Sequence, residues 1–275
     1  MYHRVAPRQL PGHESDTVTT RAFAAQMRWI ATAGYNAVSL DAVWANRTAG
    51  TPLPRRPMVI TFDDGYQDCA DNAVPILLSH GFSATFFLVA GLMGQRSNWF
   101  KAVRGYDVRL MSWAAARRLV EWGFECGSHS MTHPDLTTLD SRACRRELIE
   151  SRRILEEELR SPISTLAYPF GAYDERVRSI VAEAGYRSAC SVRAGLSSQR
   201  DDLLGLHRVT ILGQDSLPDF ILRLLTARSI RESMRALARR HLSMTAYARV
   251  RTAWYRTAEA RTSLWRRPRS GSGSA

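Results

Sequence analysis

The sequence has few cysteines and no long apolar run, and both absences exclude classes of protein. Its four cysteines, Cys69, Cys126, Cys144 and Cys190, form no CxxC pair and no dense cluster, so we interpret them as isolated buried thiols. No stretch approaches the roughly 18 apolar residues of a membrane span, and residues 1–16 lack the apolar region of a secretory signal. We therefore expect the chain as given to be cytoplasmic, an expectation that an earlier start would change.

Lysine is also scarce, since 37 of the 38 basic residues are arginine, and these arginines are unevenly distributed. Residues 221–275 contain 13 Arg and 2 Glu, a net charge of +11, whereas residues 1–220 have 25 basic and 24 acidic residues. The positive charge thus belongs to the C-terminal part, and we expect no nucleic-acid partner. We place a main domain in residues 1–217 and an Arg-rich helical tail, ending in a disordered Ser/Gly segment, in residues 218–275.

The tail interleaves arginine with apolar residues, a pattern typical of amphipathic basic helices. Two interpretations remain open. The helix could pack on the main domain with its arginines in water, which we favour, or it could bind anionic lipid or an acidic polysaccharide. Lipid binding would place the protein against the inner face of the membrane. The interleaved residues are Arg223, Leu224, Leu225, Arg228, Ile230, Arg231, Met234, Arg235, Leu237, Arg239 and Arg240.

Short strand-like runs alternate with amphipathic stretches in the main domain. The runs are residues 36–40, 58–62, 84–89, 124–127, 164–168 and 188–192. Helical periodicity separates them: Phe23, Met27 and Ile30 share one face before Gly34, and residues 141–159 place apolar residues among charges. Six or more βα repeats within residues 1–220 predict an α/β fold, and they favour a barrel over a two-layer sandwich.

Two adjacent carboxylates, Asp63 and Asp64, directly follow the strand-like run at residues 58–62. In parallel α/β folds, catalytic groups collect at the carboxyl ends of strands. Successive strand residues point to opposite faces, so both carboxylates can reach one site only if the chain bends at Gly65. Asp-Asp-Gly is also ordinary turn chemistry, and by itself the motif does not decide between these two interpretations.

Two of the seven histidines, His129 and His133, follow another strand-like run. A separation of four residues places two imidazoles on one side of a helical turn, where both can reach a divalent ion. Chance occurrence of this spacing is the alternative. Together with the Asp-Asp turn, however, the pattern predicts a site of two histidines and one carboxylate with open positions, for which Zn²⁺ is the usual ion.

The sequence resembles the polysaccharide deacetylases of the NodB type, which form carbohydrate esterase family four. The resemblance covers residues 2–215 and implies a distorted (β/α) barrel with fewer than eight regular units, with residues 1–217 as the catalytic domain. Its motifs occur in the family's order at residues 2–5, 60–66, 83–88, 127–136, 167–171, 184–187 and 206–209.

The resemblance also assigns roles to the site residues. Asp64, His129 and His133 would hold the divalent metal, and Asp63 would be the general base that takes a proton from the metal-bound water. An amide resists water at neutral pH, so a catalyst must acidify the water, polarise the carbonyl and protonate the departing amine. These requirements match a metal ion with an ionised carboxylate beside it.

A second set of roles follows from the loop Tyr168-Pro169-Phe170, which would bind substrate, with the backbone N–H of Phe170 stabilising the oxyanion. The family usually carries an arginine in this motif that orients the base, but residues 166–170 contain none. Our hypothesis is that Arg208 supplies this guanidinium to Asp63. His207 is the late histidine of the domain and a candidate general acid, although the surrounding pattern also fits a subgroup in which arginine is the marked position.

Hydrolysis of N-acetyl groups on N-acetylhexosamine units is the function that these assignments predict. The substrate would be an exopolysaccharide, a cell-wall glycan or a related glycolipid. Two alternatives remain open: hydrolysis of O-acetyl esters on another polymer, and a catalytically inactive carbohydrate-binding relative. The missing loop arginine slightly favours the inactive alternative, whereas the presence of Asp63, Asp64, His129 and His133 argues against it, because a binding module does not need all four.

Overall fold

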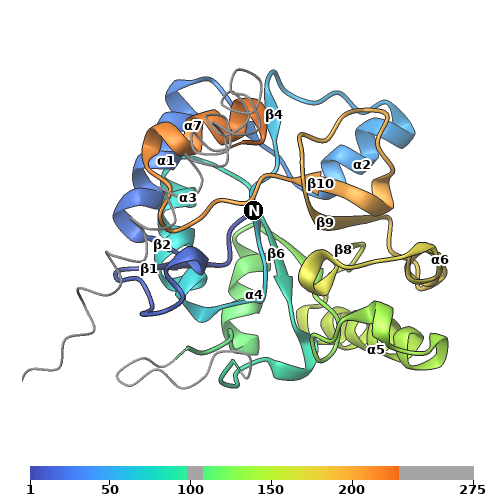
Figure 1. The fold of residues 1–275 in the computed structure, drawn as a ribbon. Coiled ribbons are helices and arrows are strands. Elements are labelled where there is room, and N and C mark those ends of the chain that lie inside the picture. Colours follow the sequence, from blue (N-terminus) through green and yellow to red (C-terminus); the bar gives the residue numbers. More distant parts are fainter. Residues whose placement is uncertain (98–107, 229–275) are drawn as a thin grey trace, which may run out of the picture. The chain divides into compact units, whose positions relative to one another are not determined.

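The computed structural model describes residues 1–97 and 108–228, and the sheet at its centre has six parallel strands. Their order is β10, β9, β8, β7, β6, β5, so each strand pairs with its neighbour in sequence. They are β5 (Thr61–Phe62), β6 (Thr85–Leu88), β7 (Glu125–Ser128), β8 (Thr165–Ala167), β9 (Ser188–Ala194) and β10 (Leu206–Arg208). The sheet curls into a distorted (β/α) barrel with fewer than eight regular units, as the sequence predicted (Figure 1).

Two smaller parallel pairs form separate two-stranded sheets. β1 (Arg4–Ala6) pairs with β2 (Thr17–Thr19), and β3 (Asn36–Ala37) pairs with β4 (Pro57–Met58). The first residues of the chain lie between the sheet edges, because the Tyr2 N–H donates to the Thr61 carbonyl and the Ile211 N–H donates to the Met1 carbonyl. The strand-like run expected at residues 58–62 is divided in the structure between β4 and β5, which belong to different sheets.

Seven α-helices cover the sheet within the described residues. They are α1 (Thr20–Thr32), α2 (Leu40–Ala49), α3 (Val74–Ser79), α4 (Trp113–Glu121), α5 (Ser141–Leu159), α6 (Glu175–Glu183) and α7 (Leu217–Thr226). The helices α4 and α5 pack against β7, and α6 packs against α5 (Figure 1). Short helical turns follow several strands: η1 (Glu14–Asp16), η2 (Cys69–Ala73), η3 (Ala90–Leu92), η4 (Leu136–Thr138), η5 (Pro169–Gly171) and η6 (Leu203–Gly205).

Apolar periodicity explains why these helices form and which face they bury. On α1, Phe23, Met27 and Ile30 are all buried, and burial of each such side chain contributes about 1.5–3 kcal/mol. The hydroxyl of Thr19 caps this helix by accepting the Ala22 N–H at 3.2 Å, and Asp140 caps α5 in the same way through Ala143. The α5 boundaries are those that the sequence predicted, Ser141 to Leu159.

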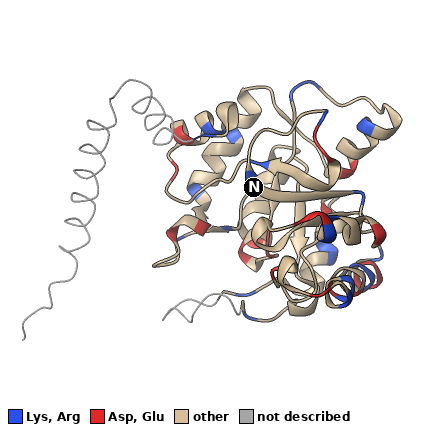
Figure 2. Cartoon of the chain, turned by 45° about the vertical axis from the view of Figure 1, so that its right-hand side comes forward, with Lys and Arg blue, Asp and Glu red and all other residues tan. Residues whose placement is uncertain are grey.

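Acidic and basic residues occur together in the described part of the chain. Figure 2 shows acidic and basic residues mixed along the outer helices, in agreement with the near-zero net charge of residues 1–220. The helix α7 packs on α1 and buries Phe220, while Arg223 pairs with Asp215 at 2.8 Å. The rest of the predicted Arg-rich tail lies outside the described residues, so its helix and its lipid or polysaccharide binding stay predictions.

By packing, residues Met1–Ala227 form one unit and Arg228–Ala275 another. Neither of the described stretches, 1–97 and 108–228, contains a helix with the length and apolar character of a membrane span. All four cysteines are unpaired and buried, as expected for isolated core thiols.

Candidate active site

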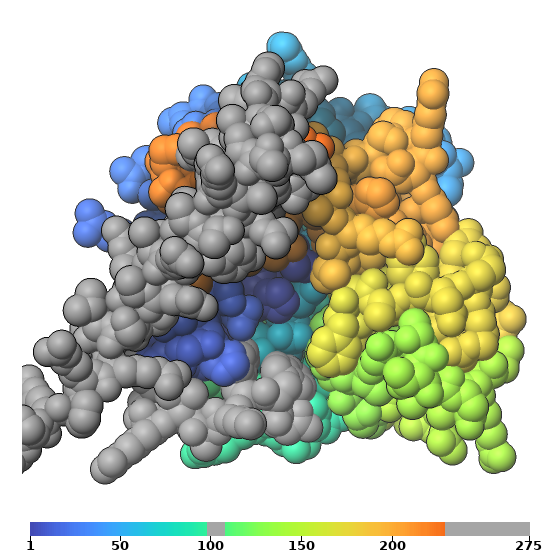
Figure 3. Space-filling view, viewed as in Figure 1, coloured from blue at the N-terminus to red at the C-terminus, as the bar shows by residue number. Residues whose placement is uncertain are grey.

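The carboxyl ends of the parallel strands bring distant parts of the sequence together. Asp63 and Asp64 follow β5, His129 follows β7, η5 follows β8, and Arg208 ends β10. Figure 3 shows the surface hollowed between the yellow segment that contains η5 and the blue N-terminal segment. Candidate catalytic groups therefore lie where a parallel α/β fold normally places them.

One oxygen of Asp64 lies between the two histidines that the sequence singled out. The Asp64 Oδ1 atom is 3.2 Å from Nε2 of His129 and 3.3 Å from Nε2 of His133. Separations of about 3.3 Å are those between ligands of a tetrahedral ion bound at roughly 2.0–2.2 Å. One ligand atom from each residue lies within 4.8 Å of the others, so this donor set can hold a single divalent metal.

Backbone bends make this convergence possible. Asp64 and Gly65 both have φ near 69°, in the left-handed region, which turns the chain directly after β5. The sequence predicted a bend at Gly65, and in the structure the bend begins one residue earlier, at Asp64. An added Cβ at Gly65 would lie only 3.0 Å from a side-chain atom of Leu88, so space also favours glycine here.

The two histidines are not on a helical turn, which corrects the prediction made from their spacing. Residues 129–133 form an irregular loop in which Ser130 has φ 65° and His133 has φ 63°. These two left-handed residues turn His133 back toward His129, and the ring centroids lie 4.8 Å apart. The spacing of four residues was correctly associated with convergence, but through a strained loop.

The buried ring of His129 is held in one orientation. Its Nδ1–H donates to the Ala167 carbonyl at 2.7 Å, so Nε2 is left to face Asp64. Burial by itself would lower the pKa of His129, but the hydrogen bond to Asp64 and the charge of Asp63 raise it above its ordinary value. Burial likewise favours the neutral form of Asp64, yet the two histidines hold the Asp64 pKa well below its usual range.

The neighbouring carboxylate, Asp63, has a different partner. Arg208 donates two hydrogen bonds to it, Nη1 to Oδ1 and Nη2 to Oδ2, each 2.7 Å long. The Nε–H of Arg208 also donates to the Ser191 carbonyl at 2.8 Å, which fixes the guanidinium in the barrel. Burial tends to raise the Asp63 pKa, but Arg208 and the nearby His129 lower it below its ordinary value. Arg208 thus lies where our hypothesis for the missing loop arginine requires it.

The loop Tyr168-Pro169-Phe170 lies beside His133. Phe170 has φ 57°, is 61% exposed, and its ring centroid lies 4.7 Å from that of His133. Tyr168 is buried, donates its hydroxyl to the Leu204 carbonyl at 2.8 Å and stacks on Tyr173, so its side chain contributes to packing. Pro169 is also buried. Substrate binding by this loop stays a prediction.

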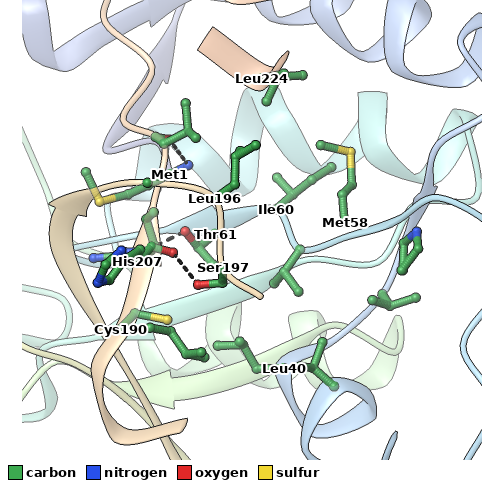
Figure 4. Close-up of a pocket in the computed structure, with 18 of the residues that line it drawn as sticks. Met1, Leu40, Met58, Ile60, Thr61, Cys190, Leu196, Ser197, His207 and Leu224 are labelled. Atoms are coloured by element: carbon green, nitrogen blue, oxygen red, sulfur yellow. Dashed lines mark hydrogen bonds between the residues drawn. The ribbon is translucent and has the colours of Figure 1, made fainter. Parts of the chain in front are cut away.

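Among the described residues, ion pairs join Asp63 to Arg208 and Asp64 to His129 and His133, and none of these uses His207. The His207 carbonyl accepts the Ser197 hydroxyl at 3.0 Å, and both His207 and Arg208 line a cavity of about 560 Å³ (Figure 4). Besides His129, His3 lies close enough to Asp63 and Asp64 to contribute to their electrostatic surroundings. His3 directly follows Tyr2, which forms a parallel bridge with Phe62 of β5 next to Asp63.

Comparison with known proteins identifies the family of the chain. The polysaccharide deacetylase family pattern matches residues 50–189, just over half of the chain. The Bacillus subtilis protein YxkH is 23% identical over 211 residues, which cover 77% of this chain and 70% of that protein. A chitooligosaccharide deacetylase of Rhizobium leguminosarum bv. phaseoli is 29% identical over 146 residues, covering 52% of this chain and 56% of the relative.

Solved structures show the same fold. The Streptococcus pyogenes deacetylase PplD, in complex with acetate, superimposes with a TM-score of 0.71 at 23% identity, over 83% of this chain and 96% of that one. A polysaccharide deacetylase from Bacillus cereus, BC0361, gives a TM-score of 0.67 at 24% identity, over 80% of this chain and 66% of the other. By its sequence pattern and its barrel, the chain belongs to the polysaccharide deacetylase family.

Proposed function

We propose that the protein hydrolyses N-acetyl groups on N-acetylhexosamine units of a polysaccharide or glycolipid. The observation that carries this proposal is the pair of adjacent buried carboxylates with different partners, Asp64 between two histidines and Asp63 on Arg208. One carboxylate is thus available as a metal ligand and the other as a base. Relatives support an N-acetylated substrate, since they include chitooligosaccharide deacetylases and a Staphylococcus aureus poly-β-1,6-N-acetyl-D-glucosamine N-deacetylase, 22% identical over 185 residues.

Asp64, His129 and His133 would hold the metal, which we assign as Zn²⁺ because two imidazoles and one carboxylate with open positions form a common catalytic zinc set. When bound, such an ion acts as a Lewis acid that polarises the acetyl carbonyl and acidifies water. The hydrogen bond of His129 to Ala167 keeps its Nε2 aimed at the site before any ion arrives.

Asp63 would accept the proton of the attacking water. It can do so because its pKa is held below the ordinary value, which keeps the carboxylate ionised at neutral pH. Arg208 fixes both oxygens of Asp63 and so sets the direction from which a water can be deprotonated. The backbone N–H of Phe170 would stabilise the oxyanion, and its exposed ring beside His133 would contact the sugar.

Acetate release decides between the amide and ester alternatives. Purified protein, loaded with Zn²⁺, is incubated with N-acetylglucosamine oligomers and, separately, with acetylated xylan, and acetate is measured over time. We expect release from the oligomers and little from xylan. Release from xylan alone would assign ester hydrolysis. Release from neither substrate, by protein that binds one equivalent of metal, would support the inactive relative.

A further inference from the structure

The loop that carries the two histidines is strained and needs support from outside itself. Ser130 and His133 both adopt left-handed backbone conformations, which cost conformational energy in residues other than glycine. Two side chains within the loop contribute: Ser128 Oγ accepts the Ser130 N–H at 3.1 Å, and Ser130 Oγ accepts the His133 N–H at 3.0 Å. These bonds leave the N–H groups of residues 131 and 132 to be satisfied from elsewhere.

Glu147, on α5, satisfies both of them. Its Oε2 atom accepts the N–H groups of Met131 and Thr132, each at 2.9 Å, and its Oε1 atom accepts the Thr132 hydroxyl at 2.7 Å. One carboxylate thus receives three hydrogen bonds from two successive residues between the histidines. Because the carboxylate is charged, each of these bonds is stronger than one between neutral groups.

The opposite side of the loop is held by η3. The Gly91 N–H donates to the Met131 carbonyl at 2.8 Å, and the Ala90 N–H donates to the Ser130 carbonyl at 3.2 Å. The approach is close, since a Cβ on Gly91 would lie 2.7 Å from the Met131 carbonyl oxygen. The loop is therefore clamped between Glu147 on one side and η3 on the other.

Glu147 differs from the acidic residues in the last turns of α5. Glu156, Glu157 and Glu158 each pair with a surface arginine, whereas no ion pair found among the described residues uses Glu147. Its hydrogen bonds go to the histidine loop. Neither a solvated surface position nor an ion pair along the helix explains the hydrogen bonds of Glu147 to this loop.

We propose that Glu147 is a positioning residue that fixes the relative placement of His129 and His133 before a metal binds. This inference rests on the metal site of the proposed function. The carboxylate stabilises the strained loop from α5, so the two imidazoles reach their metal-binding arrangement without further ordering. Removal of the carboxylate lets the loop relax, and part of the binding free energy of the ion is then used to reorder it.

The test measures Zn²⁺ affinity, by competition with a chromophoric chelator, in the full chain. Glu147→Ala is expected to raise the dissociation constant about 10- to 100-fold, the usual effect of losing a partner just outside the ligand shell. Glu147→Gln keeps one acceptor oxygen and is expected to lie between Glu147→Ala and wild type. The matched control is Glu150→Ala, an exposed position on the same helix, which should leave the dissociation constant unchanged.

Thermal unfolding with EDTA and with Zn²⁺ separates positioning from plain stabilisation. A positioning role predicts a smaller Zn²⁺-induced rise in melting temperature for Glu147→Ala than for wild type. An equal rise, or a Zn²⁺ dissociation constant within about twofold of wild type, would overturn the proposal. Should Glu147→Ala fail to fold, the same criteria apply to Glu147→Gln. Wild-type protein that binds no Zn²⁺ also overturns it, whereas weakened Zn²⁺ binding without acetate release supports Glu147 and contradicts only the proposed activity.

Discussion

Buried or half-buried carboxylates occur at both ends of the barrel, and their pKa values shift in opposite directions. At the carboxyl ends of the strands, the pKa values of Asp63 and Asp64 are lowered in spite of burial. At the amino end of β7, burial raises the pKa of Glu125 to about 7. Glu125 accepts hydrogen bonds from the Leu40 N–H and the Thr85 hydroxyl, each at 2.7 Å.

The partners explain this difference, because all three carboxylates are largely removed from water. Asp63 faces a guanidinium and Asp64 faces two imidazoles, whereas the hydrogen-bond donors to Glu125 are neutral. A buried carboxylate stays ionised where a cationic group compensates for the lost hydration. In this barrel, cationic partners lie beside the buried carboxylates at the carboxyl ends of the strands, where the proposed reaction needs ionised carboxylates.

Neutralising Asp63 is expected to have the largest effect on activity. Asp63→Asn should lower acetate release from N-acetylglucosamine oligomers about 10²- to 10⁴-fold, because the attacking water loses its base. The zinc-to-protein ratio should stay that of wild type, since Asp64, His129 and His133 are unchanged. A variant with near-normal turnover would contradict the assignment of Asp63 as the base.

Removing Arg208 should have the next largest effect. Arg208→Ala is expected to lower turnover about 10- to 100-fold, because Asp63 loses its orienting partner. The pKa of Asp63 should also rise, and since the base must be ionised, activity should be lost at a higher pH than in wild type as the solution is acidified. A pH–rate profile measures this shift, with Arg193→Ala on β9 as the control. Unchanged turnover would rule out the role that we assign to Arg208.

Neutralising Glu125 should increase the stability of the fold, whereas neutralising Asp63 should decrease it. Its pKa is raised from 4.5, so the folded state binds the proton more tightly than the unfolded chain, and stability is lost as pH rises from about 4.5 to about 7. Glu125→Gln should therefore raise the melting temperature at pH 8 by roughly a few degrees and change it less at pH 4.5.

Asp63→Asn is the matched comparison for this measurement, because it leaves Arg208 buried without its counter-charge and should lower the melting temperature at pH 8. Shifts of the same sign in Glu125→Gln and Asp63→Asn would show that partners do not separate the two ends of the barrel.

The smallest effect is expected at His207. His207→Ala should change turnover less than about twofold, because the neighbouring Arg208, and not His207, binds Asp63. His3→Ala should lower turnover more, since His3 lies near both aspartates. A large loss in His207→Ala with normal turnover in His3→Ala would restore His207 as the general acid.

Local sequence patterns predicted much of the fold. The boundaries of α5 and the buried face of α1 follow from periodicity and caps, which act over a few residues. The conformation of residues 129–133 could not be obtained in this way, because the left-handed Ser130 and His133 are maintained by Glu147 and η3, which lie elsewhere in the chain. Spacing suggested a helical turn, and tertiary contacts override that local preference.

The sequence alone determined the α/β class, the family and the candidate ligands, because apolar periodicity and short motifs involve only residues that are close together in the chain. The sequence suggested Arg208 as the partner of Asp63 and grouped Asp64 with the two histidines, but only the tertiary structure decided how these groups meet. Arg208 meets Asp63 across 145 residues, and Asp64 meets two histidines more than 60 residues away, because parallel strands end at one edge of a curled sheet. The lowered pKa of Asp63 arises from its pairing with Arg208, whereas the raised pKa of Glu125 arises mainly from burial.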